Sequence, residues 1–195
     1  TSALWLTILA FGLSGMGGGA MGIHFFPFLT DLPISSGAAA AIFSGYAIAM
    51  TCFKPLWGFL IDKYNVRRVA IGSFTALAIM HAFLIALPLW PSFWLICLAT
   101  VYAGFCMGGN AAIQEVFWAN FFGRLSLGAV RSVASPFSII SSAGGPFLAG
   151  WVYDSSGSYQ VAWTVFAGTY AIGALLIYMA RPPKKPSQVV GSPPV

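Results

Sequence analysis

Long apolar segments, each close to the length needed to cross a membrane, dominate this sequence. Of its residues, 58% are hydrophobic and only 7% are charged, and the mean hydropathy is +0.84. A soluble chain could not bury so much apolar surface, whereas a membrane-spanning helix needs about 20 apolar residues. Six segments have this length: residues 3–29, 37–61, 67–88, 92–117, 128–152 and 159–180. The sequence therefore predicts an all-α polytopic membrane protein with six transmembrane helices in a domain that covers residues 1–181.

The basic residues are distributed unevenly between the connections. Of the nine Lys and Arg residues, all except Lys54 fall on one side of the predicted membrane, whereas the loops of the other side carry Asp31 and Asp154. An excess of basic residues marks the cytoplasmic side, so both termini are expected in the cytoplasm. Nucleic acid is excluded as a partner, because the bases follow the topology instead of gathering on one polar face.

The two ends of the chain differ in character. Residues 182–195 are rich in proline and polar, which predicts a disordered cytoplasmic tail. At the other end the first apolar segment starts at once, without an initiator Met. This start favours a piece of a longer protein.

An internal repeat is visible in the sequence. A Pro followed by Gly-x-x-x-Asp closes both the second and the fifth apolar segment, in residues 55–62 and 146–154. The second segment ends on the predicted cytoplasmic side and the fifth ends outside, so the two copies have opposite orientation. Residues of about 1–88 and 92–180 are therefore predicted to be two inverted three-helix repeats, as in one half of many secondary transporters.

The loop after the second segment is the densest cluster of charge in the chain. It resembles the loop Gly-x-Leu-Ala-Asp-Arg-x-Gly-Arg-Arg of the major facilitator superfamily of secondary transporters. The residues that fit this pattern are Gly58, Leu60, Asp62, Lys63, Arg67 and Arg68. The resemblance implies a transporter that works by alternating access, and the repeat and the charges fit the C-terminal half of such a protein. It therefore implies a piece of a longer protein whose N-terminal six-helix half is missing here; a natural half that dimerises is the alternative.

A gate on the cytoplasmic side is one role for this loop. Asp62, after Gly58, can accept charge-assisted hydrogen bonds from Arg67, Arg68 or Arg124, and such a clasp would hold the cytoplasmic side shut. The alternative is a solvated loop whose charges serve only to orient the protein.

A narrower resemblance points to the substrate. Residues 26–31, Lys-Pro-x-x-Gly at 54–58, and residues 120–132 look like the branch of monocarboxylate transporters and oxalate:formate antiporters. That branch carries a cation before a Pro, which pairs with the substrate carboxylate, so the resemblance implies this role for Lys54. Met50 stands where monocarboxylate transporters have an Asp. The alternative is a Lys54 whose stem carries its charge to the interface.

Three further residues are candidates for the transport path. Tyr46, two turns before Lys54, and Asn110, near the middle of the fourth segment, are expected to line the substrate cavity. Glu115 is the acid within that segment and is a candidate proton carrier, with H⁺ as coupling ion. The alternative for Glu115 is a structural salt bridge with Arg131.

Enzyme chemistry has no support in the sequence. No nucleophile elbow, phosphate-binding loop or metal-ligand spacing is present, so we expect no catalytic residue, metal or cofactor. His24 and His81 are expected to be structural. The sequence thus favours the C-terminal half of a secondary transporter for a small organic anion, with a monocarboxylate preferred, in a bacterial inner membrane. The alternatives are an exporter of a neutral or cationic compound and a six-span membrane module that transports nothing.

Overall fold

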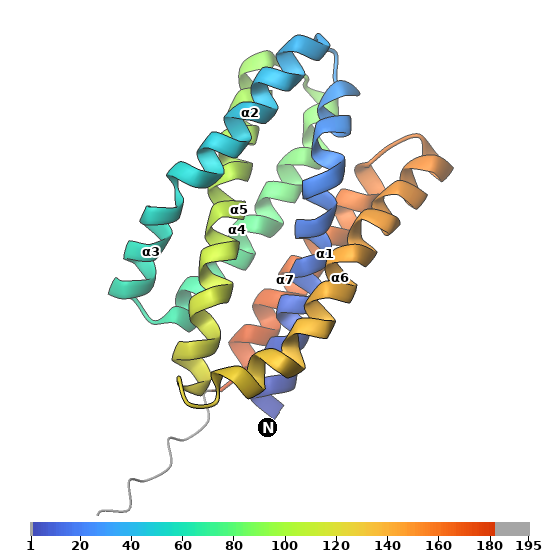
Figure 1. Cartoon of the computed structure of the whole chain (residues 1–195). Helices are drawn as coiled ribbons and strands as arrows, with labels where there is room; N and C mark the ends of the chain where they lie inside the picture. The colour runs from blue at the N-terminus through green and yellow to red at the C-terminus, as the bar shows by residue number, and fades with distance from the viewer. Residues whose placement is uncertain (1, 182–195) are drawn as a thin grey trace, which may run out of the picture.

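The computed structural model describes residues 2–181, and these form a bundle of long helices (Figure 1). The predicted disordered tail lies outside the described residues. The helices are α1 (Ser2–Thr30), α2 (Ser36–Cys52), α3 (Lys54–Lys63), α4 (Val66–Ala86), the 3-10 turn η1 (Leu87–Leu89), α5 (Phe93–Phe122), α6 (Leu127–Ser156) and α7 (Gln160–Met179).

Local sequence signals define several of the helix ends. The Ser35 side chain accepts a hydrogen bond from the Ala38 N–H at 3.2 Å and caps α2, and Asn65 caps α4 through the Arg67 N–H at 3.0 Å. Gly157 ends α6 with a φ of 66°, in the left-handed region that favours glycine.

Five helical segments within residues 2–181 are long and apolar enough to cross a membrane, and α2 and α3 together form one of them. The predicted all-α membrane fold is thereby confirmed. Helix α6 is as long as α5 but more polar, so it falls outside this group although its length suits a sixth span. Its serines within the membrane-length part are Ser132, Ser135, Ser138, Ser141 and Ser142.

The packing of the helices follows the predicted repeat. Helix α1 packs along α6, and its counterpart α5 packs along α2; α4 and α7, the last helices of each repeat, pack on each other. Each repeat has an odd number of spans, so α5 runs opposite to α1 (Figure 1). This exchange of partners is the pattern that a two-fold relation between inverted repeats requires.

Glycines allow the closest helix crossings. A Cβ atom on Gly145 of α6 would lie 1.9 Å from the Met16 carbonyl oxygen of α1, and one on Gly19 would lie 2.1 Å from the Ser142 oxygen. Where α5 crosses α2, a Cβ on Gly108 would lie 2.4 Å from the Met50 carbonyl oxygen. Small residues at such crossings let helix backbones approach within the membrane.

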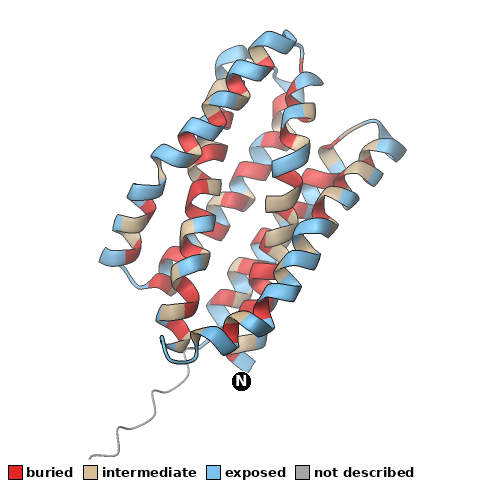
Figure 2. Cartoon of the chain, viewed as in Figure 1, coloured by how far each residue is buried: buried red, intermediate tan, exposed pale blue. Residues whose placement is uncertain are grey.

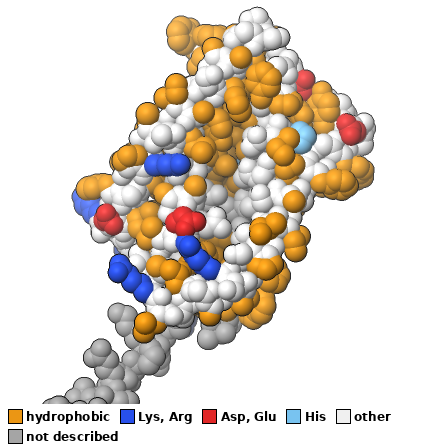
Figure 3. Space-filling view, in the orientation of Figure 1, with side chains coloured by type: hydrophobic (Ala, Val, Ile, Leu, Met, Phe, Trp, Pro, Cys, Tyr) orange, Lys and Arg blue, Asp and Glu red, His pale blue; other side chains and the backbone are white. Residues whose placement is uncertain are grey.

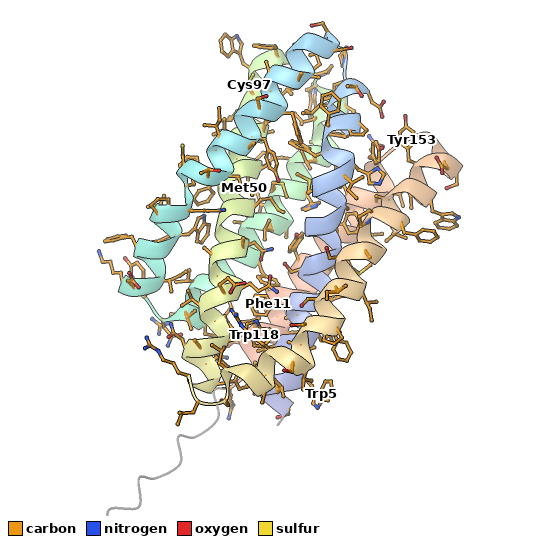
Figure 4. The ribbon with its side chains drawn as sticks, viewed as in Figure 1. Trp5, Phe11, Met50, Cys97, Trp118 and Tyr153 are labelled. Carbon is orange, nitrogen blue, oxygen red and sulfur yellow. The ribbon has the colours of Figure 1, made fainter. Side chains whose placement is uncertain are left out.

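Aromatic side chains fill the centre between the two repeats. The Phe11 ring of α1 lies 5.6 Å from that of Phe74, 5.1 Å from Phe117 and 5.2 Å from Trp118, all measured between ring centroids. Figure 4 shows Phe11 and Trp118 close together between α1 and α5. Buried residues gather along the inner helix faces, while the outer faces are exposed (Figure 2) and rich in large apolar side chains, as expected of surfaces that face lipid.

Charge separates the two ends of the bundle. The end of α3, the start of α4, the α5–α6 turn and the end of α7 lie at one end. Asp31, after α1, and Asp154, in the last turn of α6, lie at the other. On the face shown in Figure 3, the Lys and Arg side chains lie toward the lower left. The described charges are thus arranged as the predicted topology requires, and the cytoplasmic orientation itself stays a prediction.

Candidate functional site

A cavity of about 800 Å³, here called the central cavity, lies between α1, α2, α5 and α6. The four helices come from both repeats, so the cavity lies at the repeat interface. Met50, which Figure 4 labels on α2, is part of its wall. The lining residues that carry side chains larger than alanine are Ser14, Ile23, Met50, Met107, Asn110, Gln114, Ser138, Ile139, Ser142 and Pro146.

Asn110 lies in the wall of the central cavity, as expected from the sequence, and is 9% exposed. The Ser14 hydroxyl donates to the Asn110 side-chain oxygen at 3.2 Å, and the Tyr170 hydroxyl donates to the Ser14 carbonyl at 3.1 Å. These bonds connect α5, α1 and α7 and fix the amide in place. The Asn110 amide therefore presents a held polar group to the cavity, although its role in binding stays a prediction.

Two serines of α6 also line the central cavity, although they were not among the residues predicted for the transport path. Ser138 and Ser142 face the cavity, together with Pro146, and Gln114 contributes an amide from α5. Pro146 has no N–H, so it leaves the Ser142 carbonyl without its helical donor, and this carbonyl lies against Gly19. The signal in the sequence was the lower hydropathy of α6, since serines are unusual on a face that only lipid touches.

Lys54 and Tyr46 do not line the central cavity. Lys54 is exposed and begins α3, directly after Phe53, where α2 has ended. It follows Met50, a lining residue, by about one helical turn. Tyr46 is buried in an aromatic group with ring centroids 5.0 Å from Phe25 and 5.8 Å from Phe43. The structure thus places Lys54 beside the cavity and Tyr46 in the packing between α1 and α2.

Glu115 forms an ion pair with Arg131, which connects α5 to α6. Their side chains are 72% and 43% exposed, respectively. The pair lines a smaller cavity of about 250 Å³ that shares Gln114, Ser138 and Ile139 with the central cavity. The salt bridge, one of the two expectations for Glu115, is therefore formed in this conformation, at the basic end of the central cavity.

The structure does not bring the proposed clasp together. Within residues 2–181, Asp62 forms no ion pair with Arg67, Arg68 or Arg124. Instead, the Arg67 Nε donates to the Ile177 carbonyl at 3.0 Å, and its guanidinium also contacts the Tyr178 carbonyl, so Arg67 connects α4 to α7. A gate in another conformation stays a prediction.

At the acidic end of the bundle, His24 connects three helices. Its Nδ1 lies 3.1 Å from the Tyr159 hydroxyl and its Nε2 lies 3.0 Å from the Pro146 carbonyl oxygen. Nearby, the Tyr153 hydroxyl donates to Asp31 at 3.3 Å, and this bond raises the pKa of Tyr153. His24 thus has hydrogen-bonded partners, which agrees with a structural role for this side chain.

His81 is buried. Its Nδ1 bonds the Leu77 carbonyl at 2.9 Å, and the ring packs on Trp163 and Tyr170.

Comparison with known proteins assigns the chain to a family. The model of the Major Facilitator Superfamily matches residues 3–194. The multidrug resistance protein B homolog of Mycobacterium tuberculosis is 26% identical over 153 residues, which are 78% of this chain and 27% of that protein. Human monocarboxylate transporter 7 is 25% identical over 177 residues, which are 89% of this chain and 34% of that protein. The chain therefore spans about a third or less of these relatives. With a family match over nearly its whole length, and with long helices of two three-span repeats that pack mainly on one another, the chain belongs to the Major Facilitator Superfamily.

Proposed function

We propose that this chain forms one half of a secondary transporter and that the central cavity is its share of the substrate site. Family membership indicates a transporter rather than an enzyme. Transporters built from inverted repeats bind substrate at the repeat interface near the middle of the membrane. The central cavity lies at the repeat interface, because its wall combines α1 and α2 of one repeat with α5 and α6 of the other.

The other side of the substrate site would come from a second six-helix half. The chain covers only 27% and 34% of the relatives described above, which leaves room in them for such a half. The serines of α6 and the amides of α5 would face it across the substrate. Alternating access then consists of rocking between the two halves.

An uncharged organic compound of mixed polarity is the substrate class that the cavity fits best. The observation that carries this proposal is the lining, in which no described residue is charged: hydroxyl and amide groups alternate with two methionines and two isoleucines. Such walls take up apolar surface and orient the ligand through a few polar groups, and methionine adapts to ligands of different shape. The similarity to a protein named for multidrug resistance agrees with this class.

A small carboxylate is the second candidate, and Lys54 favours it. A Lys inside a membrane-length segment is costly unless it is hydrated or paired. Lys54 stands one turn from the cavity residue Met50, at a break between helices that is followed by Pro55. Movement of α3 toward α5 would bring its charge to the cavity. The similarity to a monocarboxylate transporter agrees with this candidate.

Coupling to protons would act through the Glu115–Arg131 pair. Protonation of Glu115 removes its charge and with it the attraction to Arg131. Helices α5 and α6 otherwise make few contacts, so loss of the pair would separate them at the basic end of the cavity. We place this end in the cytoplasm of a bacterial cell, with both termini on that side, because the described basic residues gather there.

A transport assay in proteoliposomes distinguishes the two substrate classes. The protein is tested with a panel of neutral and carboxylate compounds, as wild type and as Gln114→Ala, Lys54→Gln and Lys54→Arg. For a neutral substrate, Gln114→Ala slows transport severalfold while Lys54→Gln is tolerated. For a carboxylate, Lys54→Gln abolishes transport and Lys54→Arg retains part of it, because the charge remains. Normal transport by Gln114→Ala of every compound carried would contradict the assignment of the central cavity.

A further inference from the structure

A second polar cavity, of about 500 Å³, lies at the basic end of the bundle where α4 begins and α5 and α7 end; it is here called the arginine pocket. It lies away from the central cavity, and its lining shares no residue with it. Its lining residues are Asn65, Val66, Arg67, Arg68, Ile71, Asn120, Phe121 and Tyr178.

Positive charge is concentrated in the arginine pocket. Arg67 and Arg68 lie in its wall, and no acidic residue does. A neighbouring cavity of about 510 Å³ shares Arg67 and Tyr178 with it and adds Arg181. The first turn of α4 contributes backbone N–H groups and the positive end of the helix dipole. An anion in the pocket would therefore meet the two arginines of its wall and a helix N-terminus, with Arg181 in the neighbouring cavity.

The two arginines of the pocket have different tasks. Arg67 is half-buried and binds the last carbonyls of α7, Ile177 and Tyr178, so it also offsets the negative end of that helix. Arg68 is exposed and makes no hydrogen bond with the described residues. Arg68 is thus the side chain that can turn its planar fork to a ligand, and phosphate is the group that this fork binds in two-pronged fashion.

The pocket is layered from polar to apolar in the direction of the membrane. Asn65 and the arginines lie at the helix end, whereas Ile71 lies a turn deeper in α4. Phe121 and Tyr178 supply aromatic surface beside them. Apolar surface below a basic group at the level of helix ends suits a molecule with an anionic head and a hydrocarbon tail, and basic pockets between transmembrane helices on the cytoplasmic side suit anionic lipid head groups.

We propose that the arginine pocket binds the phosphate head group of an anionic phospholipid, with Arg68 as its main contact and Arg67 holding the floor of the site to α7. A bound lipid would then stabilise the contact between the start of α4 and the end of α7. A free phosphate ion shares the head-group chemistry but does not use the apolar surface of Ile71 and Phe121.

Native mass spectrometry of the intact protein in mild detergent tests this proposal. Phosphatidylglycerol and phosphatidylcholine are added in turn, and the bound lipid is counted on wild type, Arg68→Gln and Lys63→Gln. Lys63 is a matched control, because it lies at the same end of the bundle, loses the same charge, and lines neither arginine-rich cavity. Wild type and Lys63→Gln should retain phosphatidylglycerol in preference to phosphatidylcholine, and Arg68→Gln should bind it about tenfold more weakly.

Two further variants keep the test decisive if Arg68→Gln does not fold. Arg68→Lys keeps the charge without the fork and should bind with intermediate strength, whereas Asn120→Asp places an acid beside the arginines and should repel the head group. Equal retention of phosphatidylglycerol by wild type and the Arg68 variants would overturn the proposal. Inorganic phosphate is added as a competitor. If it binds wild type without lipid and displaces phosphatidylglycerol when the two are present at equal concentration, the pocket is a free-anion site and the proposal is overturned.

Discussion

Two of the helix crossings that join the repeats, α1 with α6 and α5 with α2, share their packing but differ in continuity. In both, a glycine brings one backbone against a carbonyl of the partner: Gly145 against Met16 in the first, and Gly108 against Met50 in the second. Yet α6 runs unbroken from Leu127 to Ser156 through two prolines, whereas the α2 segment breaks before Pro55.

The contacts around Pro146 and Pro55 account for this difference. Gly145, next to Pro146, packs on the α1 backbone. The Pro146 carbonyl accepts a hydrogen bond from His24 Nε2 of α1. These contacts with α1 stabilise α6 as one continuous helix although a helical hydrogen bond is missing. Near Pro55, the Phe53 ring packs on Phe105 with centroids 5.3 Å apart. Among the described residues, no side chain donates a hydrogen bond to the Pro55 carbonyl as His24 does to that of Pro146. The helix therefore restarts there as α3.

The crossings also differ in what they offer to the central cavity. The first supplies hydroxyl groups from Ser138 and Ser142, and the second supplies the thioethers of Met50 and Met107. A close crossing needs only small residues at the contact points, so the residues beside them are free to set the chemistry of the cavity. Architecture and substrate chemistry are thus carried by different positions of the same helices.

The largest expected effect is at the first crossing. Gly145→Ala places a methyl group 1.9 Å from the Met16 carbonyl, where only backbone movement can relieve the overlap, so we expect a loss of about 2 kcal/mol of stability. Gly144→Ala is the matched control, because its Cβ meets nothing within 4 Å and alanine favours the helix, with a gain of up to about 1 kcal/mol. Thermal unfolding in detergent measures both. Equal stability of the two variants would show that the crossing is looser than described.

The second crossing should respond in the same direction. Gly108→Ala would place a methyl group 2.4 Å from the Met50 carbonyl, and we expect a loss of about 1–2 kcal/mol, because the nearby break at Phe53 lets α2 move. The same unfolding assay applies. A loss larger than that of Gly145→Ala would mean that the break gives no relief and would reverse the order of the two crossings.

A smaller effect is expected where α3 is held to α5. The Trp57 indole N–H donates to the Phe105 carbonyl at 2.9 Å, and its ring centroid lies 4.9 Å from that of Phe105. Trp57→Phe keeps much of the ring packing and removes the hydrogen bond, so we expect a loss of about 1 kcal/mol. Faster hydrogen exchange confined to residues 54–63 would accompany it. Unchanged exchange there would show that packing alone holds α3.

The smallest expected effect on stability is at the ion pair that joins the two crossings. Because both side chains are exposed, Glu115 and Arg131 should couple by only about 0.2–1 kcal/mol in a double-mutant cycle with Glu115→Gln and Arg131→Gln. Transport should respond more strongly if the pair is a gate, with similar defects in the two single variants and in the double variant. Full transport by all three variants would leave the pair a surface contact.

The predicted spans, the inverted repeats and the charge layout follow from short-range features of the chain. The bounds of each predicted segment agree within a few residues with those of one helix. The second segment corresponds to α2 and α3 together. The break at Phe53 was not predicted, because a proline near the middle of an apolar segment can be absorbed or can end a helix, and neighbouring contacts decide which.

The candidate site was predicted less completely. Asn110 and the Glu115–Arg131 pair could be anticipated, since polar groups inside a membrane need partners or a cavity. Tyr46 could not be placed, because helical spacing from Lys54 assumes one continuous helix. Arg67 and Arg68 were predicted as partners of Asp62, but the end of α7, more than a hundred residues away in the chain, lies closer to Arg67.

Short-range features of the chain are enough to predict a bundle of membrane helices with one basic end, because hydropathy over 20 residues and the charge of short loops act locally. Which helix faces meet depends instead on the packing of the whole bundle. Whether a serine of α6 faces lipid or a cavity, and whether an arginine meets an acid or a helix end, depends on how helices from two repeats cross. Those crossings are set by glycines whose partners are remote in the chain and that carry no local signal of what they touch.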